Sequence, residues 1–217
     1  MVRNVLIAGA GPGVSGSLAR LFGAEGARVG LLGVDEPVLA RLSEEVTAAG
    51  GTSESAVADL TDDAATRAVV TGIGERFGRL DVVHFNPSAF REKDPLELTP
   101  DELLADVRLG VGALLTLVQA ARPFLGAGGR VSVTGSMAAD RPWHRAASLG
   151  VQKAGVRNLV HSLDATLKVD GIRAVSVTVR GSLSADGPFT PDRVADALRA
   201  AIDQDETAWR TEVPFEG

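Results

Sequence analysis

The sequence of 217 residues contains no tyrosine and no cysteine, and aromatic side chains make up only 4% of it. The absence of cysteine excludes disulfide bonds and thiolate metal sites, and it suits a reducing compartment such as the cytoplasm. The histidines are few and far apart, at His84, His144 and His161, so we expect no histidine-rich metal site. The absence of tyrosine means that no phenol can serve as a proton donor.

A basic block and a long N-terminal apolar run are also missing. The net charge is −6, which argues against nucleic acid as the main partner. The opening stretch MVRNVLIAGAGPG has only a short apolar run before its glycines, so it predicts neither a signal peptide nor a membrane span. The length is typical of a single domain, which we expect to cover residues 1–217.

Apolar, β-branched runs alternate with helical patterns along the whole chain. Their nearly continuous apolar character is typical of strands that are buried on both faces. The pattern predicts an α/β protein, a three-layer doubly wound Rossmann fold with a mostly parallel sheet of six to seven strands. The expected strands are 4–9, 28–33, 55–59, 80–85, 129–135, 172–179 and 211–215.

Three helices have recognisable starts. Thr61-Asp62-Asp63 combines a cap with negative charge at the positive end of the helix dipole. Thr99-Pro100-Asp101-Glu102 is a capping box with proline in the first turn, and Thr190-Pro191-Asp192 opens a helix in the same way. Two long helices are expected at 99–122 and 150–168.

The segment VLIAGAGPGVSG after the first strand is a glycine loop before a helix. Two spacings fit it, Gly11-x-Gly13-x-x-Gly16 and Gly9-x-x-x-Gly13-x-Ser15, and we prefer the second because it begins directly after the strand. Glycines allow the backbone to approach a pyrophosphate, whose charge the helix N-terminus attracts. We expect Gly9, Gly11, Gly13 and Val14 to bind a dinucleotide; the alternative is a tight strand–helix turn.

In a doubly wound sheet, ligands bind outside the carboxyl ends of the strands. Polar or glycine-containing segments follow several of the expected strands here, which supports a site at this edge. These segments are the glycine loop, Asp59, Asn86-Pro87-Ser88, Gly135-Ser136-Met137 and Arg180-Gly181-Ser182.

At this point the chain resembles the short-chain dehydrogenase/reductase family, from about residue 4 to residue 181. The segments that carry the resemblance are AGAGPGVS in the glycine loop, FNPS after the fourth strand, VTGSMAA after the fifth and Lys153 in the next helix. The resemblance implies that Ser136 polarises a substrate carbonyl and that Lys153 binds the nicotinamide ribose. It also implies cofactor contacts by Asp59-Leu60 at the adenine, by Asn86-Pro87, and by Gly181.

Several positions depart from the family pattern. The family's catalytic tyrosine falls on Leu149, and the asparagine of its central helix falls on Leu109. Its Pro-Gly after the sixth strand becomes Arg180-Gly181, and only residues 182–189 stand where a substrate lid is usual. We therefore expect an open, shallow site, in which the proton comes from His144, from Lys153, from water or from an acidic group on the substrate.

Each candidate also has a structural interpretation. Lys153 fits a solvated helix lysine, Ser136 a strand-end turn, and Asn86 and Asp59 turn or cap residues. His144, on the loop before the Lys153 helix, is a candidate acid in place of the phenol, or an exposed loop histidine. We expect His84 to be a buried neutral imidazole, His161 to lie on a helix surface, and Phe85 and Trp143 to serve packing.

The cofactor is expected to be NAD(H) or NADP(H). The family's selective positions carry Gly33 and Val34, neither acidic nor basic. Asp35 and Glu36 would repel a 2′-phosphate, which favours NAD(H), and Asp35 could accept from a ribose hydroxyl. Its alternative role is a helix N-cap before Pro37.

Two functions follow from these observations. The first is an atypical NAD(P)-dependent oxidoreductase that reduces a carbonyl or quinone-like group of an unidentified small molecule. The second is a dinucleotide-binding sensor or partner subunit without catalysis, and a loss of nucleotide binding is a third possibility. In either case the two long helices make a homodimer or homotetramer the expected assembly.

Overall fold

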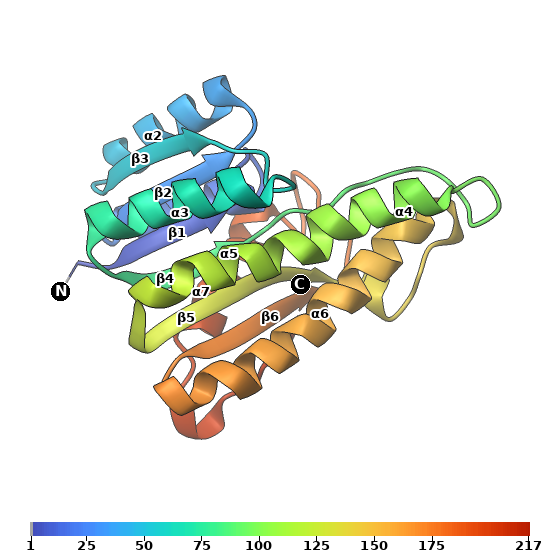
Figure 1. Cartoon of the computed structure of the whole chain (residues 1–217). Coiled ribbons are helices and arrows are strands. Elements are labelled where there is room, and N and C mark those ends of the chain that lie inside the picture. The colour runs from blue at the N-terminus through green and yellow to red at the C-terminus, as the bar shows by residue number, and fades with distance from the viewer. Residues whose placement is uncertain (1) are drawn as a thin grey trace.

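Strands form in all seven expected regions, and they pair into one sheet in the order β3-β2-β1-β4-β5-β6-β7 (Figure 1). The computed structural model describes residues 2–217. Every strand pair within that range is parallel, so the sheet has the upper number of strands expected and is more uniform than expected. The strands are β1 Asn4–Ala8, β2 Arg28–Gly33, β3 Thr52–Val57, β4 Leu80–Phe85, β5 Leu125–Ser136, β6 Arg173–Val179 and β7 Glu212–Phe215.

The third strand differs from its prediction. It runs from Thr52 to Val57 rather than over 55–59, and its side chains are exposed or half-buried. It pairs only with β2, and as an edge strand it needs no apolar side chains on both faces. The polar start Thr52-Ser53-Glu54 therefore belongs to the strand, although its composition is typical of a loop. β5 likewise begins earlier than expected, at Leu125, with a register shift against β4.

Helices cover both faces of the sheet (Figure 1). One core lies between the sheet and the face that holds α3, α5 and α6, and the other lies between the sheet and α1, α2 and α7. The three-layer prediction is therefore confirmed. The helices are α1 Val14–Ala24, α2 Glu36–Ala48, α3 Asp63–Phe77, α4 Pro100–Val107, α5 Ala113–Ala121, α6 Ala147–Leu167 and α7 Pro191–Ile202.

The predicted helix starts are observed with one change. Thr99 and Glu102 form the reciprocal capping box of α4, and Thr190 caps α7. The cap of α3 is Asp62, whose carboxylate accepts from Ala65 N, and not Thr61. α6 begins at Ala147 rather than at 150, which adds a turn that faces the carboxyl edge of the sheet.

The predicted helix at 99–122 is continuous but not uniform. A π-helical turn, Arg108–Gly112, joins α4 to α5. The stretch Pro100–Phe124 is long and apolar enough to cross a membrane by length and composition. A core helix passes the same test, and α5 packs on the sheet through Leu114, Leu117 and Ala121. The absence of a membrane partner stays a prediction.

Candidate functional site

The strand order reverses between β1 and β4, and a cleft of about 330 Å³ opens near this point, at the carboxyl edge of the sheet. This is the location that doubly wound folds use for ligands. The loops after β4, β5 and β6 and the first turns of α1 and α6 form its walls. Of the residues predicted from the sequence, it brings together Gly13, Val14, Asn86, Ser136, Lys153 and Gly181.

Glycines of both registers are sterically constrained: a Cβ atom at Gly16 would lie 2.6 Å from Gly11 O, and Gly9 is confined as well. Gly9 follows the strand with a φ of +78°, a backbone conformation that favours glycine. A Cβ atom at Gly9 would lie 2.7 Å from the Pro87 ring, whereas Cβ atoms at Gly11 and Gly13 would meet no atom within 4 Å. The loop therefore packs tightly on its protein side and leaves open space on the other.

The N-terminus of α1 faces that open space. Its N-cap is Gly13, which makes no side-chain cap, and its first turn holds no acidic residue. The free N–H groups and the positive end of the helix dipole make such a terminus suitable for an anion. The residues present fit a pyrophosphate, although a tight strand–helix turn alone would not need the open side.

Ser15, which stands where the family has a glycine, cross-links the backbone of the glycine loop. Its hydroxyl donates to Gly9 O at 3.0 Å and accepts from Gly11 N at 3.0 Å. Asn86 Nδ2 lies 3.4 Å from both Gly9 O and Ser15 Oγ, and the Asn86 N–H donates to Ala8 O. Asn86 therefore orients the loop backbone, as expected for a residue at the end of β4.

Lys153 is not a solvated helix lysine. It is buried, with 6% of its surface exposed, and its ammonium donates to Thr134 O at 2.9 Å on the floor of the cleft. Burial lowers the pKa of Lys153 from 10.5 to about 8, because the charged form loses water. No salt bridge to Lys153 is present within residues 2–217. The amine is therefore mostly protonated at neutral pH and loses its proton as pH rises through about 8.

Ser136 ends β5 and begins the short turn Met137–Ala139. Its Oγ accepts from Ala138 N at 3.2 Å, so the structural interpretation, a strand-end turn, holds. That bond uses a lone pair and leaves the hydroxyl proton free to donate. Since Ser136 also lines the cleft, the turn and a donor role for its hydroxyl are compatible.

Apolar side chains occupy the positions where the family has its tyrosine and asparagine. Leu149 lines the cleft one helical turn before Lys153. Leu109 lies in the π-helical turn and packs against the core below α3, α5 and α6. Neither side chain can donate or accept a proton, so the side-chain donors that line the cleft are the Lys153 amine, the Asn86 amide and the hydroxyls.

The residue that sequence reasoning missed is Thr134. It lines the cleft two residues before Ser136 on the same face of β5. Its carbonyl holds Lys153, and its hydroxyl lies 3.3 Å from Nε2 of His84. The alternation Ser132-x-Thr134-x-Ser136, with Val133 and Gly135 between, was the available signal, since polar side chains on one face of a buried strand need partners.

His84 is fully buried, as predicted. Its Nδ1 lies 2.7 Å from Ser132 Oγ on the neighbouring strand. Burial, and then the nearby Lys153 charge, lower the pKa of His84 to about 3. The imidazole is therefore neutral at every physiological pH.

The loop after β4 is anchored by a buried glutamine. Gln152 Oε1 accepts from Ala89 N at 2.9 Å, and its Nε2 donates to Ala89 O at 3.1 Å. A Cβ atom at Gly110 would lie 2.5 Å from Gln152 Oε1, so a glycine is required opposite. This pair holds Ser88, which also lines the cleft, against α6.

The residues expected at the adenine end have structural roles of their own. Asp59 Oδ1 accepts from the hydroxyl and the N–H of Thr61, and these bonds lower the Asp59 pKa. Leu60 is buried in the core.

Asp35 caps α2 by accepting from Val38 N at 3.0 Å, so its N-cap interpretation is confirmed. An acidic residue at position 33 would not fit, because a Cβ atom there lies 2.8 Å from Ala10 O.

His144 does not lie in this cleft. It lines a separate apolar hollow of about 550 Å³ between the start of α4 and the turn before α6, together with Pro95 and Trp143.

Trp143 remains 45% exposed and stacks on Phe90, so it is only partly a packing residue, whereas Phe85 is buried as predicted. His161 is exposed on α6, as expected.

Residues 182–189 contain neither helix nor strand. Leu183 from this segment reaches the cleft but stays 54% exposed. At its far end Phe189 packs edge-on against Phe215 and lies over Gly181. The segment therefore borders the cleft without covering it.

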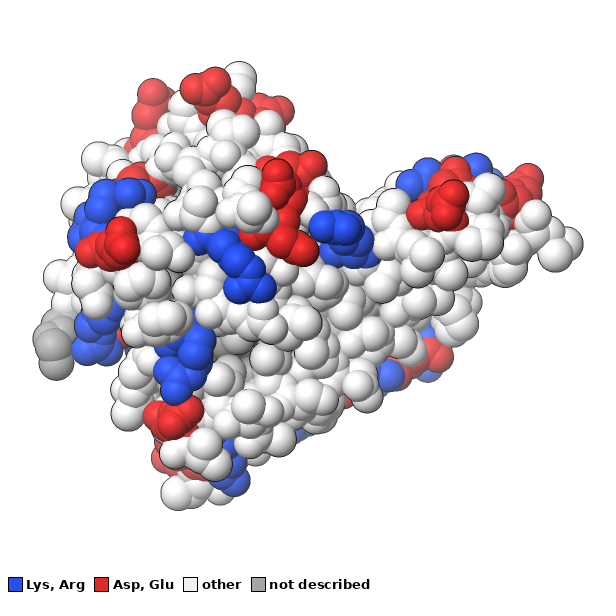
Figure 2. All heavy atoms as spheres, viewed as in Figure 1, with Lys and Arg blue, Asp and Glu red and all other residues white. Residues whose placement is uncertain are grey.

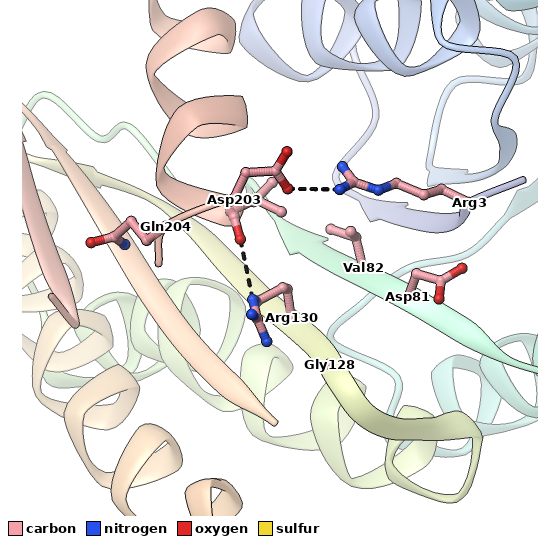
Figure 3. A pocket seen from close by; sticks show the side chains of 8 residues that line it. Arg3, Asp81, Val82, Gly128, Arg130, Asp203 and Gln204 are labelled. Atoms are coloured by element: carbon pink, nitrogen blue, oxygen red, sulfur yellow. Dashed lines mark hydrogen bonds and ion pairs between the residues drawn. The ribbon is translucent and has the colours of Figure 1, made fainter. Parts of the chain in front are cut away.

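A second hollow, of about 340 Å³, lies at the opposite edge of the sheet (Figure 3). Its arginines have protein partners: Arg3 pairs with Asp203 at 2.8 Å, and Arg130 donates to the backbone carbonyl of Ile202 at 3.1 Å. No cluster of three or more metal-ligating side chains is found between residues 2 and 217.

Comparison with known proteins agrees with this geometry. A family model described as enoyl-(acyl carrier protein) reductase matches residues 9–204. The oxidoreductase UcpA of Escherichia coli K12 is 29% identical over 181 residues, which cover 81% of this chain and 67% of UcpA. The A-factor type gamma-butyrolactone 1′-reductase (1S-forming) of Streptomyces virginiae is 32% identical over 219 aligned positions, with coverages of 97% and 85%.

Solved structures superpose over nearly the whole chain. A metagenomic short-chain oxidoreductase in complex with NADP has a TM-score of 0.87 at 28% identity, with 98% of this chain and 96% of the other covered. The NADH-dependent reductase A1-R′ in complex with NAD has a TM-score of 0.86 at 22% identity and coverages of 100% and 96%, a likeness of fold. On the family model and these relatives, the chain belongs to the short-chain dehydrogenase/reductase family of oxidoreductases.

Proposed function

We propose that the protein is an NAD(P)-dependent oxidoreductase that reduces a carbonyl or quinone-like group and uses Lys153 as its proton donor in place of a tyrosine. The observation that carries the proposal is the buried amine of Lys153 on the cleft floor, with a pKa of about 8. A general acid works best when its pKa lies near the working pH. His144, our other candidate acid, lines a different hollow, and we leave it out of the mechanism.

The glycine loop supports the dinucleotide in this proposal. Gly9, Gly11, Gly13 and Val14 would hold the pyrophosphate at the N-terminus of α1, where glycine leaves room and the helix offers N–H groups. Asn86 would keep that loop in shape through Ser15 and Gly9. We assign the remaining cofactor contacts to two loop segments and one glycine: Asp59-Leu60, Asn86-Pro87 and Gly181.

When bound, the nicotinamide supplies the hydride, and the protein must orient and polarise the acceptor. Ser136 would donate a hydrogen bond from its free hydroxyl to the acceptor oxygen and keep its proton. Lys153 would give up a proton from its ammonium, which its low pKa makes easier than for an ordinary lysine. Leu149 would exclude water from the wall beside Ser136 and Lys153, which strengthens the hydrogen bonds of both groups to the acceptor.

The uncovered cleft points to the kind of acceptor. Residues 182–189 have no helix to close over a substrate, and Leu183 stays half exposed at the rim. A large or flat substrate would supply by its own surface the apolar cover that a lid usually gives. A quinone or an activated ketone with a flat conjugated body fits this description.

The test is reduction by NADH and NADPH of a panel of quinones and activated ketones, followed by stopped-flow absorbance. We expect turnover with at least one acceptor and a loss of about 10²-fold or more in kcat for Ser136→Ala. His144→Gln is the matched control and should keep the wild-type rate. Absence of turnover with every acceptor, or a wild-type rate in Ser136→Ala, would contradict the proposal.

The second candidate is a dinucleotide-binding sensor or partner subunit without catalysis. Leu149 and Leu109 favour it, because neither can take part in the proton relay of the family. Under this alternative, calorimetry would detect NADH or NADPH binding while the purified protein turned over no acceptor.

We propose NAD(H) as the preferred cofactor. Asp35 and Glu36 lie at the start of α2, just after β2, where a 2′-phosphate would approach, and Gly33 leaves no room for a selective side chain. Calorimetry should give a lower Kd for NADH than for NADPH. An equal or lower Kd for NADPH would refute this choice.

We also propose a homodimer or homotetramer that uses the long helices. Figure 2 shows that few charged side chains cover the middle of the face over α5 and α6. Leu104 on α4, Leu115 on α5 and Val151 on α6 are each at least 41% exposed. Light scattering coupled to gel filtration should report two or four chains, and Leu115→Lys should shift the protein toward the monomer.

A further inference from the structure

A column of polar side chains runs from the interior of the sheet to the floor of the cleft. Ser132 and His84 are fully buried on neighbouring strands and lie 2.7 Å apart, Oγ to Nδ1. On the other side of the ring, Nε2 lies 3.3 Å from the hydroxyl of Thr134. Thr134 is half-buried and lines the cleft, so the column ends where a ligand would lie.

The hydrogen-bond partners of Ser132 determine which ring nitrogen of His84 carries the proton. Within residues 2–217, His84 is the one hydrogen-bond partner of the Ser132 hydroxyl, and a buried hydroxyl proton without an acceptor is costly. A neutral imidazole has one N–H and one acceptor nitrogen. If Ser132 donates to Nδ1, the ring proton must sit on Nε2 and point at Thr134 Oγ1.

The consequence for Thr134 follows directly. Its oxygen then accepts from His84 Nε2, so its own proton is free to point away from the ring, and the cleft that Thr134 lines offers it an acceptor when a substrate is bound. The opposite tautomer would place the proton on Nδ1 and leave the Ser132 proton without an acceptor in the interior. The Lys153 ammonium is the ionisable neighbour of the ring, and it also favours a neutral His84.

We propose that Thr134 is a further catalytic residue, whose hydroxyl donates to the reacting oxygen of the substrate, and that the buried His84 is the positioning residue that orients this donor. The inference rests on the proposed reduction and adds a residue to its site. Thr134 already holds the Lys153 ammonium through its carbonyl, so one residue places the acid and adds a hydrogen bond of its own.

With this assignment the polar side chains on the cleft floor that we have described all act as donors. The Ser136 hydroxyl, the Thr134 hydroxyl and the Lys153 ammonium come from β5 and α6 and line one cleft. Donors fixed in advance stabilise negative charge that develops on an oxygen during reaction. The Thr134 hydroxyl would replace part of the transition-state stabilisation that the phenol gives in the family, and it would do so as a hydrogen-bond donor that keeps its proton.

The first experiment tests the His84 assignment without any substrate. The chain has three histidines, so ¹⁵N-histidine labelling gives three ring systems, and the His84 signals are those lost in His84→Gln. We expect two-dimensional ¹H–¹⁵N spectra to show a protonated Nε2 and an unprotonated Nδ1. A proton on Nδ1 would overturn the inference, even if the enzyme proves active.

The second experiment uses two matched pairs of variants. Thr134→Val removes the hydroxyl and should lower kcat by about 10- to 100-fold with the NADH Kd unchanged, while Thr134→Ser should stay within about 3-fold of wild type. The amide of His84→Gln lies where Nε2 was, and that of His84→Asn lies where Nδ1 was. His84→Gln should therefore keep most of kcat, and His84→Asn should lose as much as Thr134→Val.

The outcomes separate a catalytic role from a structural one. A purely structural imidazole would make His84→Gln and His84→Asn equal in kcat, and that result would overturn the inference. A weaker NADH Kd with an unchanged kcat in Thr134→Val would assign the hydroxyl to the cofactor instead and would also overturn it. If wild type reduces no acceptor, the proposed function fails, and the tautomer still decides the hydrogen-bond assignment.

Discussion

The two edges of the sheet differ in the partners that they give to a buried positive charge. Near the amino edge, Arg173 is buried with 7% of its side chain exposed, and its guanidinium makes a bidentate pair with Asp164 at 2.9 and 2.7 Å. At the carboxyl edge, Lys153 is equally buried but has a carbonyl as its only acceptor within residues 2–217. Burying a charge without an oppositely charged partner destabilises the folded protein. The presence of such a charge at Lys153 therefore indicates that the carboxyl edge is the functional edge.

The difference extends to the pKa values. At the amino edge the hydrogen bonds to Asp164 raise the pKa of Arg173 and hold its charge. At the carboxyl edge burial lowers the pKa of Lys153 to about 8. The first arrangement is suited to stability and the second to proton transfer, and substitutions at each edge should separate the two properties.

The largest expected effect is on the rate at the carboxyl edge. Lys153→Met keeps the length of the side chain and removes the proton donor, so kcat with the best acceptor should fall by about 10²- to 10⁴-fold. Lys168→Met, at the exposed end of α6, should leave kcat unchanged. In wild type the rate of reduction should fall as pH rises through about 8, since the amine loses its proton there. A flat profile between pH 6 and 9 would show that another group gives the proton.

The next effect is on stability at the amino edge. Asp164→Ala leaves Arg173 buried without its bidentate partner and also removes acceptors for Ala174 N and Thr211 Oγ1. We expect the free energy of unfolding to fall by about 3–5 kcal/mol in urea titrations. Asp140→Ala removes an exposed partner of Arg157 and should cost less than about 1 kcal/mol. Similar losses in the two variants would remove the distinction between the edges.

A smaller change of opposite sign is expected for Lys153→Met in the same titrations. The folded protein binds the Lys153 proton more weakly than the unfolded chain, because the pKa falls from 10.5 to about 8. This penalty, about 3 kcal/mol at most, is fully present below pH 8 and disappears as pH rises from 8 to 10.5. The variant should therefore be more stable than wild type at pH 7, and the two should converge near pH 10.5. A variant that is less stable at pH 7 would contradict the desolvation of Lys153.

The smallest effect concerns the glycine loop. Ser15→Gly restores the family residue and removes the hydroxyl that links Gly9, Gly11 and Asn86. Loss of these neutral hydrogen bonds and greater backbone freedom should cost about 1 kcal/mol of stability. The Kd for NADH should change by less than about 3-fold, because the open side of the loop is unaltered. A larger change, measured by calorimetry, would indicate direct contact of Ser15 with the cofactor.

Much of this architecture follows from local patterns. The alternation of apolar strands with capped helices predicted the sheet, and the capping box at Thr99 and the cap at Thr190 were readable because both motifs lie within four residues of chain. The single-domain assignment over residues 1–217 stays a prediction. The edge strand β3 was misplaced because its exposure depends on which strands lie beside it, and a short polar run does not reveal that.

The site divides in the same way. The chain by itself determined that no phenol is present, that a glycine loop follows the first strand, and that Lys153 and Ser136 stand at family spacing. Tertiary structure alone decided that Lys153 is buried without a carboxylate partner among residues 2–217, that His144 lies in another hollow, and that Ser132, His84 and Thr134 form one column. The reason is that desolvation and hydrogen-bond partners come from strands and helices far apart in sequence, which only the packed sheet brings together.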